Sequence, residues 1–266
     1  MTRPLIRIED IDDPRIAAYR NIRERDLVGR EGRFIAEGRV VLNVLFSTSR
    51  FSAESVFLRD NRVAGLGELI THIPEDVPVY VADGSVMDGI AGFEMHRGVV
   101  AIGRKPATDG AGLLDSLPRE ALVVALSGIA NHDNMGSIFR NAASFGAAAV
   151  LLTEDCCDPL YRKAIRVSVG AALKVPFARF PDVDTLAASL IERDFSLLAL
   201  SPRGALDIAD VSRADRHALL LGSEGHGLSE EVMERLPTAR IDMAADFDSL
   251  NVAAASAIAL HRLWRG

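Results

Sequence analysis

The sequence predicts an α/β protein in which a small α/β domain precedes a larger domain built on a parallel sheet. Three observations predict this class. Short apolar runs typical of buried strands recur along the 266 residues. After residue 120 these runs alternate with stretches of helical spacing, which indicates a parallel sheet covered by helices on both faces. A segment rich in Pro, Gly, Asp and Ser separates the two parts.

The first part, residues 1–107, is predicted to be a small α/β domain. Its strand-like runs lie at 55–58, 77–82 and 98–103, and helix-like stretches separate them. Residues 108–119, inside PATDGAGLLDSLPRE, are predicted to be a linker. A chain of this length can form two domains that each bury their own core.

The second part, residues 120–266, is predicted to alternate strands and helices. The strand-like runs are 121–126, 148–153, 175–180, 196–201, 217–222 and 239–244. The helix-like stretches are 134–145, 159–173, 182–195, 228–236 and 250–264. Ligands of such sheets bind at the carboxyl ends of the strands, so three loops are of interest: 127–136, 222–229 and 243–251.

Composition indicates a globular protein of the cytoplasm without a metal. Hydrophobic residues make up 48% and charged residues 25%, and no apolar run approaches the ~20 residues of a membrane span. The N-terminus lacks a signal-peptide core. Cys156 and Cys157 are adjacent, which favours reduced thiols, and no cluster of His, Cys and carboxylates has the spacing of metal ligands.

The charge distribution leaves two interpretations open. A net charge of −7 argues against a protein that coats nucleic acid. Basic residues nevertheless gather around Arg97 and in the stretch 159–179, which contains no acidic residue between Pro159 and Arg179. This stretch is either a solvated helix face or a track for RNA phosphates.

The loop 127–136 leads into a predicted helix that carries an arginine near its N-terminus, where a positive charge is unfavourable. Asn134 and Gly136 lie at the predicted helix start, where free backbone N–H groups favour a polar ligand. Arg140 follows Gly136 by one helical turn and opposes the helix dipole. Its presence suggests a role beyond helix stability.

The loop 222–229 resembles a phosphate loop in its glycine spacing but not in its charges. Leu228 stands where such a loop has its lysine, and Glu224 lies inside the turn. Gly222 and Gly225 allow a close backbone approach to a ligand. The turn therefore suits a flat polar molecule such as adenosine or a cationic ligand, and not a polyphosphate.

The loop 243–251 leads into the last helix. Ser249 and Asn251 lie at its entrance, either as caps or as ligand contacts, and capping is the expectation for Ser249 taken alone. The small residues from Val252 to Ala259 let this helix pack closely against a neighbour.

Together, three motifs resemble those of the SpoU-type RNA methyltransferases of the SPOUT superfamily. They are N-M-G-S-I-F-R from Asn134, L-G-S-E-G-H-G-L-S from Leu221, and I-D-M from Ile241 with D-S-L-N-V-A-A-A-S-A-I after it. The resemblance covers 121–266 and extends weakly to 32–42 and 93–106. His132-Asp133 replaces a common Pro-Gly and Asn141 a common Thr, which leaves the substrate open.

The resemblance implies a trefoil-knot α/β fold and transfer of a methyl group from S-adenosylmethionine to a ribose 2′-hydroxyl in tRNA or rRNA. It implies a catalytic role for Arg140, with Asn134, Glu224, Ser249 and Asn251 as hydrogen-bonding partners of that arginine, the ribose or the cofactor. It implies that the cofactor contacts Leu200, Gly222, Ser223, Ile241, Met243 and Leu250. A guanidinium stays protonated, so Arg140 is better suited to hold a phosphate or stabilise an alkoxide than to act as a base.

The resemblance also implies a homodimer formed through the C-terminal domain and an N-terminal accessory domain that binds RNA. The candidate RNA contacts are Arg97, Arg162, Lys163 and Arg166. Two alternatives remain open, methylation of an RNA base and RNA binding or assembly without catalysis. Also open are the target nucleotide and whether Arg140 serves its own subunit's cofactor or that of the partner.

Overall fold

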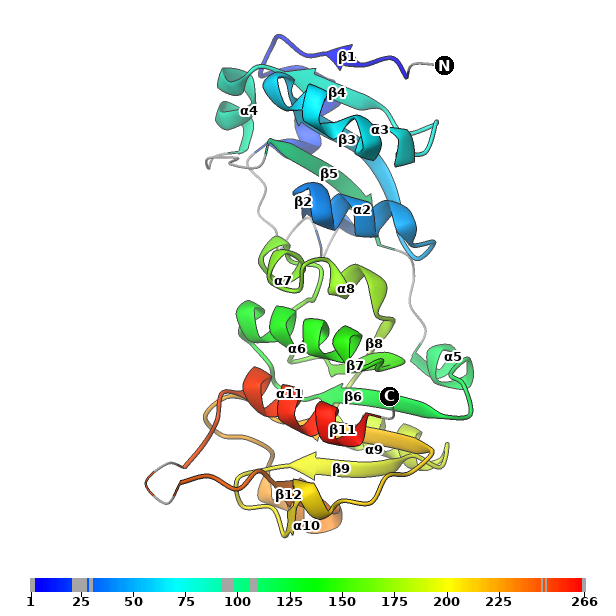
Figure 1. The fold of residues 1–266 in the computed structure, drawn as a ribbon, viewed down its shortest axis with the longest axis vertical. Coiled ribbons are helices and arrows are strands. Elements are labelled where there is room, and N and C mark those ends of the chain that lie inside the picture. Colours follow the sequence, from blue (N-terminus) through cyan, green and yellow to red (C-terminus); the bar gives the residue numbers. More distant parts are fainter. Residues whose placement is uncertain are drawn as a thin grey trace. The chain divides into compact units, whose positions relative to one another are not determined.

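The computed structural model describes residues 3–20, 28, 31–91, 98–105, 110–244, 246 and 248–264. The chain folds into two compact units (Figure 1). The first unit is Met1–Pro106 together with Leu160–Lys174, and the second is Ala107–Pro159 together with Val175–Gly266.

The first unit is a five-stranded sheet with helices. Its strand order is β1-β4-β3-β5-β2, with β5 antiparallel to both of its neighbours and the other pairs parallel. The strands are β1 (Ile6–Arg7), β2 (Arg33–Glu37), β3 (Ser52–Arg59), β4 (Val79–Ala82) and β5 (Val99–Arg104). The helices are α2 (Arg39–Ser47), α3 (Gly67–His72) and α4 (Gly84–Ala91), with 3-10 turns η1 (Pro14–Tyr19) and η2 (Asp60–Leu66).

Two short helices from the middle of the chain also belong to the first unit. The stretch 159–173, expected as one helix, forms α7 (Arg162–Val167) and α8 (Ala171–Lys174) instead. Val169 and Gly170 interrupt it because both have positive φ, 55° and 85°. A Cβ on Gly170 would lie 3.1 Å from Val44 of α2, which shows how closely this segment packs.

The second unit is a seven-stranded sheet in which every pair is parallel, as the sequence predicts. The strand order is β10-β12-β9-β11-β6-β7-β8. The strands are β6 (Ala121–Leu126), β7 (Ala149–Thr153), β8 (Phe177–Phe180), β9 (Ser196–Leu200), β10 (Leu206–Asp207), β11 (Arg216–Leu221) and β12 (Thr238–Arg240). The sequence does not predict the two-residue β10, because so short a run carries no periodicity.

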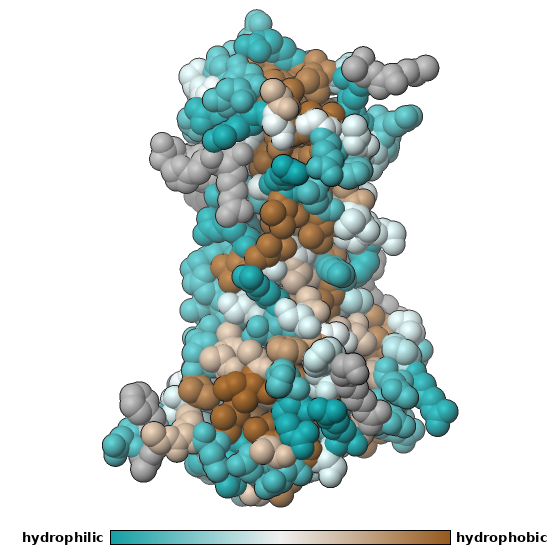
Figure 2. Space-filling model, in the orientation of Figure 1, coloured by the Kyte–Doolittle hydropathy of each residue, from teal (hydrophilic) through white to brown (hydrophobic). Residues whose placement is uncertain are grey.

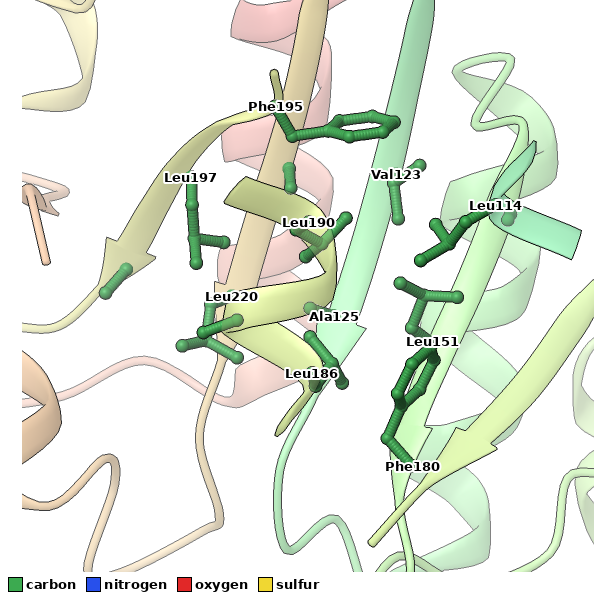
Figure 3. Packing of buried hydrophobic residues seen from close by; sticks show 14 of the residues in the cluster. Leu114, Val123, Ala125, Leu151, Phe180, Leu186, Leu190, Phe195, Leu197 and Leu220 are labelled. Carbon is green, nitrogen blue, oxygen red and sulfur yellow. The ribbon is translucent and has the colours of Figure 1, made fainter. Parts of the chain in front are cut away.

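Helices cover both faces of this sheet. They are α5 (Gly110–Asp115), α6 (His132–Ser144), α9 (Val183–Ile191), α10 (Glu230–Arg235) and α11 (Val252–Leu263), with the 3-10 turn η3 (Ile208–Asp210). Helices α6 and α11 pack side by side on one face (Figure 1). On the other face, apolar side chains of the central strands interlock with Leu114, Leu186 and Leu190 (Figure 3).

The segment expected as a linker is partly helical. Helix α5 lies within residues 108–119, and its Leu114 is buried beside Leu151 in the core of the second unit (Figure 3). Glycine and aspartate make this stretch look irregular, but the two leucines Leu113 and Leu114 gain enough from burial to order it. In the described residues, no helix has the length and apolarity needed to cross a membrane.

Candidate functional site

A tight turn after β11 forms one wall of the candidate site. The backbone N–H of Gly227 donates to Ser223 O at 3.0 Å, and Gly225 and Gly227 have positive φ of 93° and 67°. A Cβ on Gly222 would lie 2.5 Å from backbone atoms of Gly227 and Leu228. Glycine is therefore required at 222 by the close return of the chain upon itself.

The start of α6 forms a second wall. Asn131 caps this helix, accepting a hydrogen bond from Asp133 N at 2.8 Å, and the helix begins two residues before the predicted start at 134. The preceding loop is fixed to its neighbours, because Ser127 N donates to Leu221 O at 3.0 Å and Gly128 N to Asp155 Oδ1 at 3.1 Å.

Three of the predicted catalytic side chains form a hydrogen-bonded chain. Asn134, which is buried, donates through Nδ2 to Glu224 Oε1 and accepts through Oδ1 from Asn251 Nδ2 at 3.0 Å. These residues come from α6, the turn after β11 and the entrance of α11. These hydrogen bonds therefore connect all three of the loops that the sequence analysis identified as candidate ligand-binding loops.

Asn251, and not Ser249, is the cap of α11. Its Oδ1 accepts from Ala253 N at 2.9 Å and from Ala254 N at 3.3 Å, while its amide group faces Asn134. Ser249 instead donates to Asp248 Oδ1 at 3.2 Å. The expectation that Ser249 caps the helix is wrong, because α11 starts two residues later than the predicted 250 and the cap moves with it.

Arg140 does not join this chain of side chains. It lies six residues after Asn134 on α6, which places it ~9 Å further along the helix and on a different face. Its side chain is exposed, and no hydrogen bond or ion pair of its guanidinium occurs within the described residues. Arg140 is therefore accessible to another molecule.

A cavity of about 610 Å³ opens at the carboxyl ends of β9, β11 and β12. All six residues that the resemblance assigns to the cofactor line it, as do Glu224, Ser249 and Asn251. Sequence reasoning missed several further lining residues: Pro202, Arg203, His226, Met233, Asp248, Val252 and Ala255. Most of these residues could have been found from the sequence, because they belong to the loops that follow parallel strands, where ligands of such sheets bind.

The chemistry of this cavity fits a flat, positively charged ligand. Apolar side chains such as Leu200, Ile241 and Met243 can contact the faces of a ring system, and the backbone of the glycine turn can hydrogen-bond its edge. Glu224 and Asp248 place carboxylates at the wall, which disfavours a polyphosphate and favours a cation.

The four candidate RNA contacts have different surroundings. Arg97 lies outside the described residues. Arg162 donates through Nε to Glu37 Oε2 at 2.7 Å, and Glu37 is buried, so this arginine holds α7 against β2. Lys163 and Arg166 are exposed on α7.

The two cysteines are free thiols. Burial raises the pKa of Cys156, and burial raises the pKa of Cys157 to about 12. Neither is a thiolate near neutral pH, so neither is suited to act as a nucleophile or a metal ligand there. Among the described residues, no group of three or more His, Cys, Asp or Glu is arranged to hold a metal ion.

Comparison with protein families matches residues 121–261 to the model of the SpoU rRNA Methylase family. The chain is 39% identical over 266 residues to an uncharacterized tRNA/rRNA methyltransferase of Mycobacterium bovis, covering 96% of this chain and 90% of that protein. It is 32% identical over 180 residues to the 23S rRNA (guanosine-2′-O-)-methyltransferase RlmB of Bordetella pertussis, covering 66% of this chain and 73% of that protein.

Among solved structures, the fold is similar to that of an rRNA methyltransferase from Sinorhizobium meliloti with AdoMet (S-adenosylmethionine) bound. The TM-score is 0.79 at 23% identity, and the match covers 97% of each chain. At 23% identity this likeness shows a shared fold, and because the match covers 97% of the chain the shared fold includes the first unit.

Proposed function

The chain belongs to the SpoU rRNA Methylase family, and from this premise we propose that it transfers the methyl group of S-adenosylmethionine to a ribose 2′-hydroxyl of tRNA or rRNA. One observation carries the proposal. The hydrogen-bonded chain of Glu224, Asn134 and Asn251 borders a cavity of cofactor size at the carboxyl ends of parallel strands. The relatives named above include a 2′-O-methyltransferase of rRNA.

The cavity suits S-adenosylmethionine in size and in chemistry. Its volume of about 610 Å³ lies in the range of small-molecule sites. Leu200, Ile241, Met243 and Leu250 would contact the adenine and thioether parts, and the backbone at Gly222 and Ser223 would hydrogen-bond polar edges. The bound cofactor supplies a methyl group activated by a sulfonium.

Side chains of the protein itself position the ribose and stabilise the charge that develops during methyl transfer. Asn134 is fixed on both sides, so its orientation is set before any ligand binds, which favours catalysis by preorganisation. Arg140, exposed and unpaired within the described residues, holds the phosphate next to the target ribose and stabilises the developing alkoxide. Ser249 and Asn251 contact the ligand from the entrance of α11.

We further propose that the first unit binds RNA in the cytoplasm. A ribose 2′-hydroxyl distinguishes RNA from DNA, and an exposed one is found in loops and bulges. Lys163 and Arg166 on α7 are exposed cations that can contact phosphates, and Arg97 is proposed with them. Arg162 contributes by holding α7 in place against Glu37.

A trefoil knot and a homodimer complete the proposal. Helix α11 follows β12, near one edge of the sheet, yet packs on α6 and β11 nearer its middle, which supports a threaded C-terminus. Ile258 and Trp264 of the α11 segment are 43% and 41% exposed, and Figure 2 shows hydrophobic surface on this part of the molecule. A second copy is the proposed partner for this surface.

The test is the loss and recovery of a ribose methyl group. Total tRNA and rRNA from wild-type and deletion strains would be digested, and the 2′-O-methyl nucleosides quantified by mass spectrometry. We expect one of them to disappear on deletion, to return with the wild-type gene and not to return with Arg140→Ala. Loss of a base methyl instead would identify a base methyltransferase. Unchanged methylation, with no binding of S-adenosylmethionine by the purified protein, would favour an RNA-binding protein without catalysis.

A further inference from the structure

The ribose hydroxyl must lose a proton during methyl transfer, and the proposed site contains few groups that can take it. A guanidinium is protonated throughout the working range of pH, so Arg140 is unsuited to this step. A proton acceptor must lie within hydrogen-bonding reach of the substrate, which limits the choice to groups at the cavity. Among the described residues that line the cavity, those whose side chains could take up a proton are Glu224, Asp248 and His226.

The two carboxylates are already engaged. Glu224 accepts a hydrogen bond from the amide of Asn134, and Asp248 accepts one from Ser249 Oγ at 3.2 Å. A carboxylate that already accepts a hydrogen bond is less available to take up a proton from the ribose. Histidine, in contrast, ordinarily changes its protonation between about pH 5 and 8, which matches the needs of a general base.

His226 lies in the glycine turn that borders the cavity. It stands between Gly225 and Gly227, both of positive φ, in the turn that the Ser223–Gly227 pairing closes. The turn is anchored to α6 through Glu224, two residues away. His226 is among the residues that line the cavity and is exposed, and within the described residues neither ring nitrogen has a hydrogen-bond partner.

We propose that His226 is the proton acceptor for the ribose 2′-hydroxyl, an inference that rests on the proposed function. The ribose O–H bond breaks and its proton passes to a ring nitrogen of His226. The oxygen bonds to the methyl carbon as the carbon–sulfur bond breaks, and that electron pair stays on sulfur. The sulfonium becomes a neutral thioether, and the positive charge passes to the imidazolium.

The charged groups around His226 can accommodate this charge. Glu224 lies on the same turn and Asp248 on the loop before α11, and both can stabilise an imidazolium. The positive charge of Arg203, on the loop after β9, disfavours an imidazolium. The guanidinium of Arg203, however, pairs with Glu230 at 3.3 Å. The charged residues that line the cavity with His226, among those the structure describes, are thus two carboxylates and one paired arginine.

The test measures single-turnover methyl transfer from labelled S-adenosylmethionine to tRNA and rRNA isolated from a deletion strain, between about pH 5.5 and 9. For the wild type we expect the rate of methyl transfer to fall toward the acid end of this pH range. His226→Gln should lower the rate at neutral pH by roughly 10²-fold and abolish the acid fall. Calorimetric binding of S-adenosylmethionine should be the same for the variant and the wild type. His72→Gln, the same change at an exposed histidine of α3, should behave as wild type.

Two results would overturn the proposal while leaving the proposed function intact. One is an acid fall that persists in His226→Gln and in His226→Ala. The other is loss of S-adenosylmethionine binding in both variants, which would make His226 a cofactor contact. No methyl transfer by the wild type to either RNA fraction would overturn the proposed function and this inference together.

Discussion

Asn134 is the residue on which the candidate site is centred. It is buried, and it is the donor to Glu224 and the acceptor from Asn251. Removing its amide takes one hydrogen bond from each of these two partners, and because both partners are exposed the change should act on their orientation more than on stability.

We expect Asn134→Ala to lower the rate of methyl transfer by roughly 10²-fold and to weaken cofactor binding much less. The measurements are single-turnover transfer and calorimetry. The matched control is Asn43→Ala, since Asn43 is an exposed asparagine of α2. An activity equal to that of the control would show that Asn134 is a purely structural residue.

The two thiols, one buried and one half-buried, predict how stability depends on alkaline pH. Burial raises the pKa of Cys156, and of Cys157 to about 12, from the ordinary 9.0. Above about pH 9 the unfolded chain loses these protons while the folded chain keeps them, so the free energy of unfolding falls as pH rises toward the folded pKa.

Urea denaturation between about pH 8 and 10 would measure this fall, and Cys157→Ser should make it shallower than in the wild type. Equal slopes for the two proteins would assign the alkaline loss of stability to other groups.

At the scale of elements, the turn after β11 depends on Gly222. An alanine there would place its Cβ 2.5 Å from the backbone of Gly227 and Leu228, and backbone cannot move aside without opening the turn. We expect Gly222→Ala to abolish S-adenosylmethionine binding in calorimetry.

Gly67→Ala is the matched control for that variant. Gly67 has φ −53° and open space around its Cβ position, so the substitution is tolerated. Binding by Gly222→Ala at wild-type affinity would show that the turn does not shape the cofactor site.

The ion pair between Glu37 of β2 and Arg162 of α7 joins elements that are 125 residues apart in sequence. Removing Arg162 leaves a buried carboxylate without its cation, which typically costs about 3–5 kcal/mol. We therefore expect Arg162→Ala to lower the free energy of unfolding by that order, measured by urea denaturation.

Arg162→Met combined with Glu37→Gln should recover much of the loss, because no uncompensated charge is left buried. If the single variant is as stable as the wild type, the pair is not formed in solution. If it unfolds normally but loses RNA affinity, Arg162 contacts RNA directly.

For the whole molecule, the proposed homodimer predicts a mass of twice 28.7 kDa in solution. Light scattering coupled to gel filtration would measure it. Ile258→Glu places a charge on the exposed apolar face of α11 and should yield monomers, because a buried unpaired charge is costly at an interface. Ile191→Glu, at an exposed isoleucine of α9, should leave the dimer intact. A monomeric wild type would contradict the proposal.

Local sequence patterns predicted the parallel sheet of the second unit and the three loops of the candidate site. Fully apolar strands must be covered on both faces, and parallel strands bring their carboxyl ends to one edge, so local pattern suffices for both. It also identified Asn134, Glu224 and Asn251, which the structure joins by hydrogen bonds.

Which of these side chains meet, and which do not, depends on the three-dimensional fold. Arg140 lies away from the chain of hydrogen bonds because of its place around α6, and Arg162 is held by a carboxylate distant in sequence. The buried helix α5 and the break at Val169 and Gly170 arise from packing that no short window contains. Contacts between residues far apart in the chain depend on the folded path, which local periodicity does not encode.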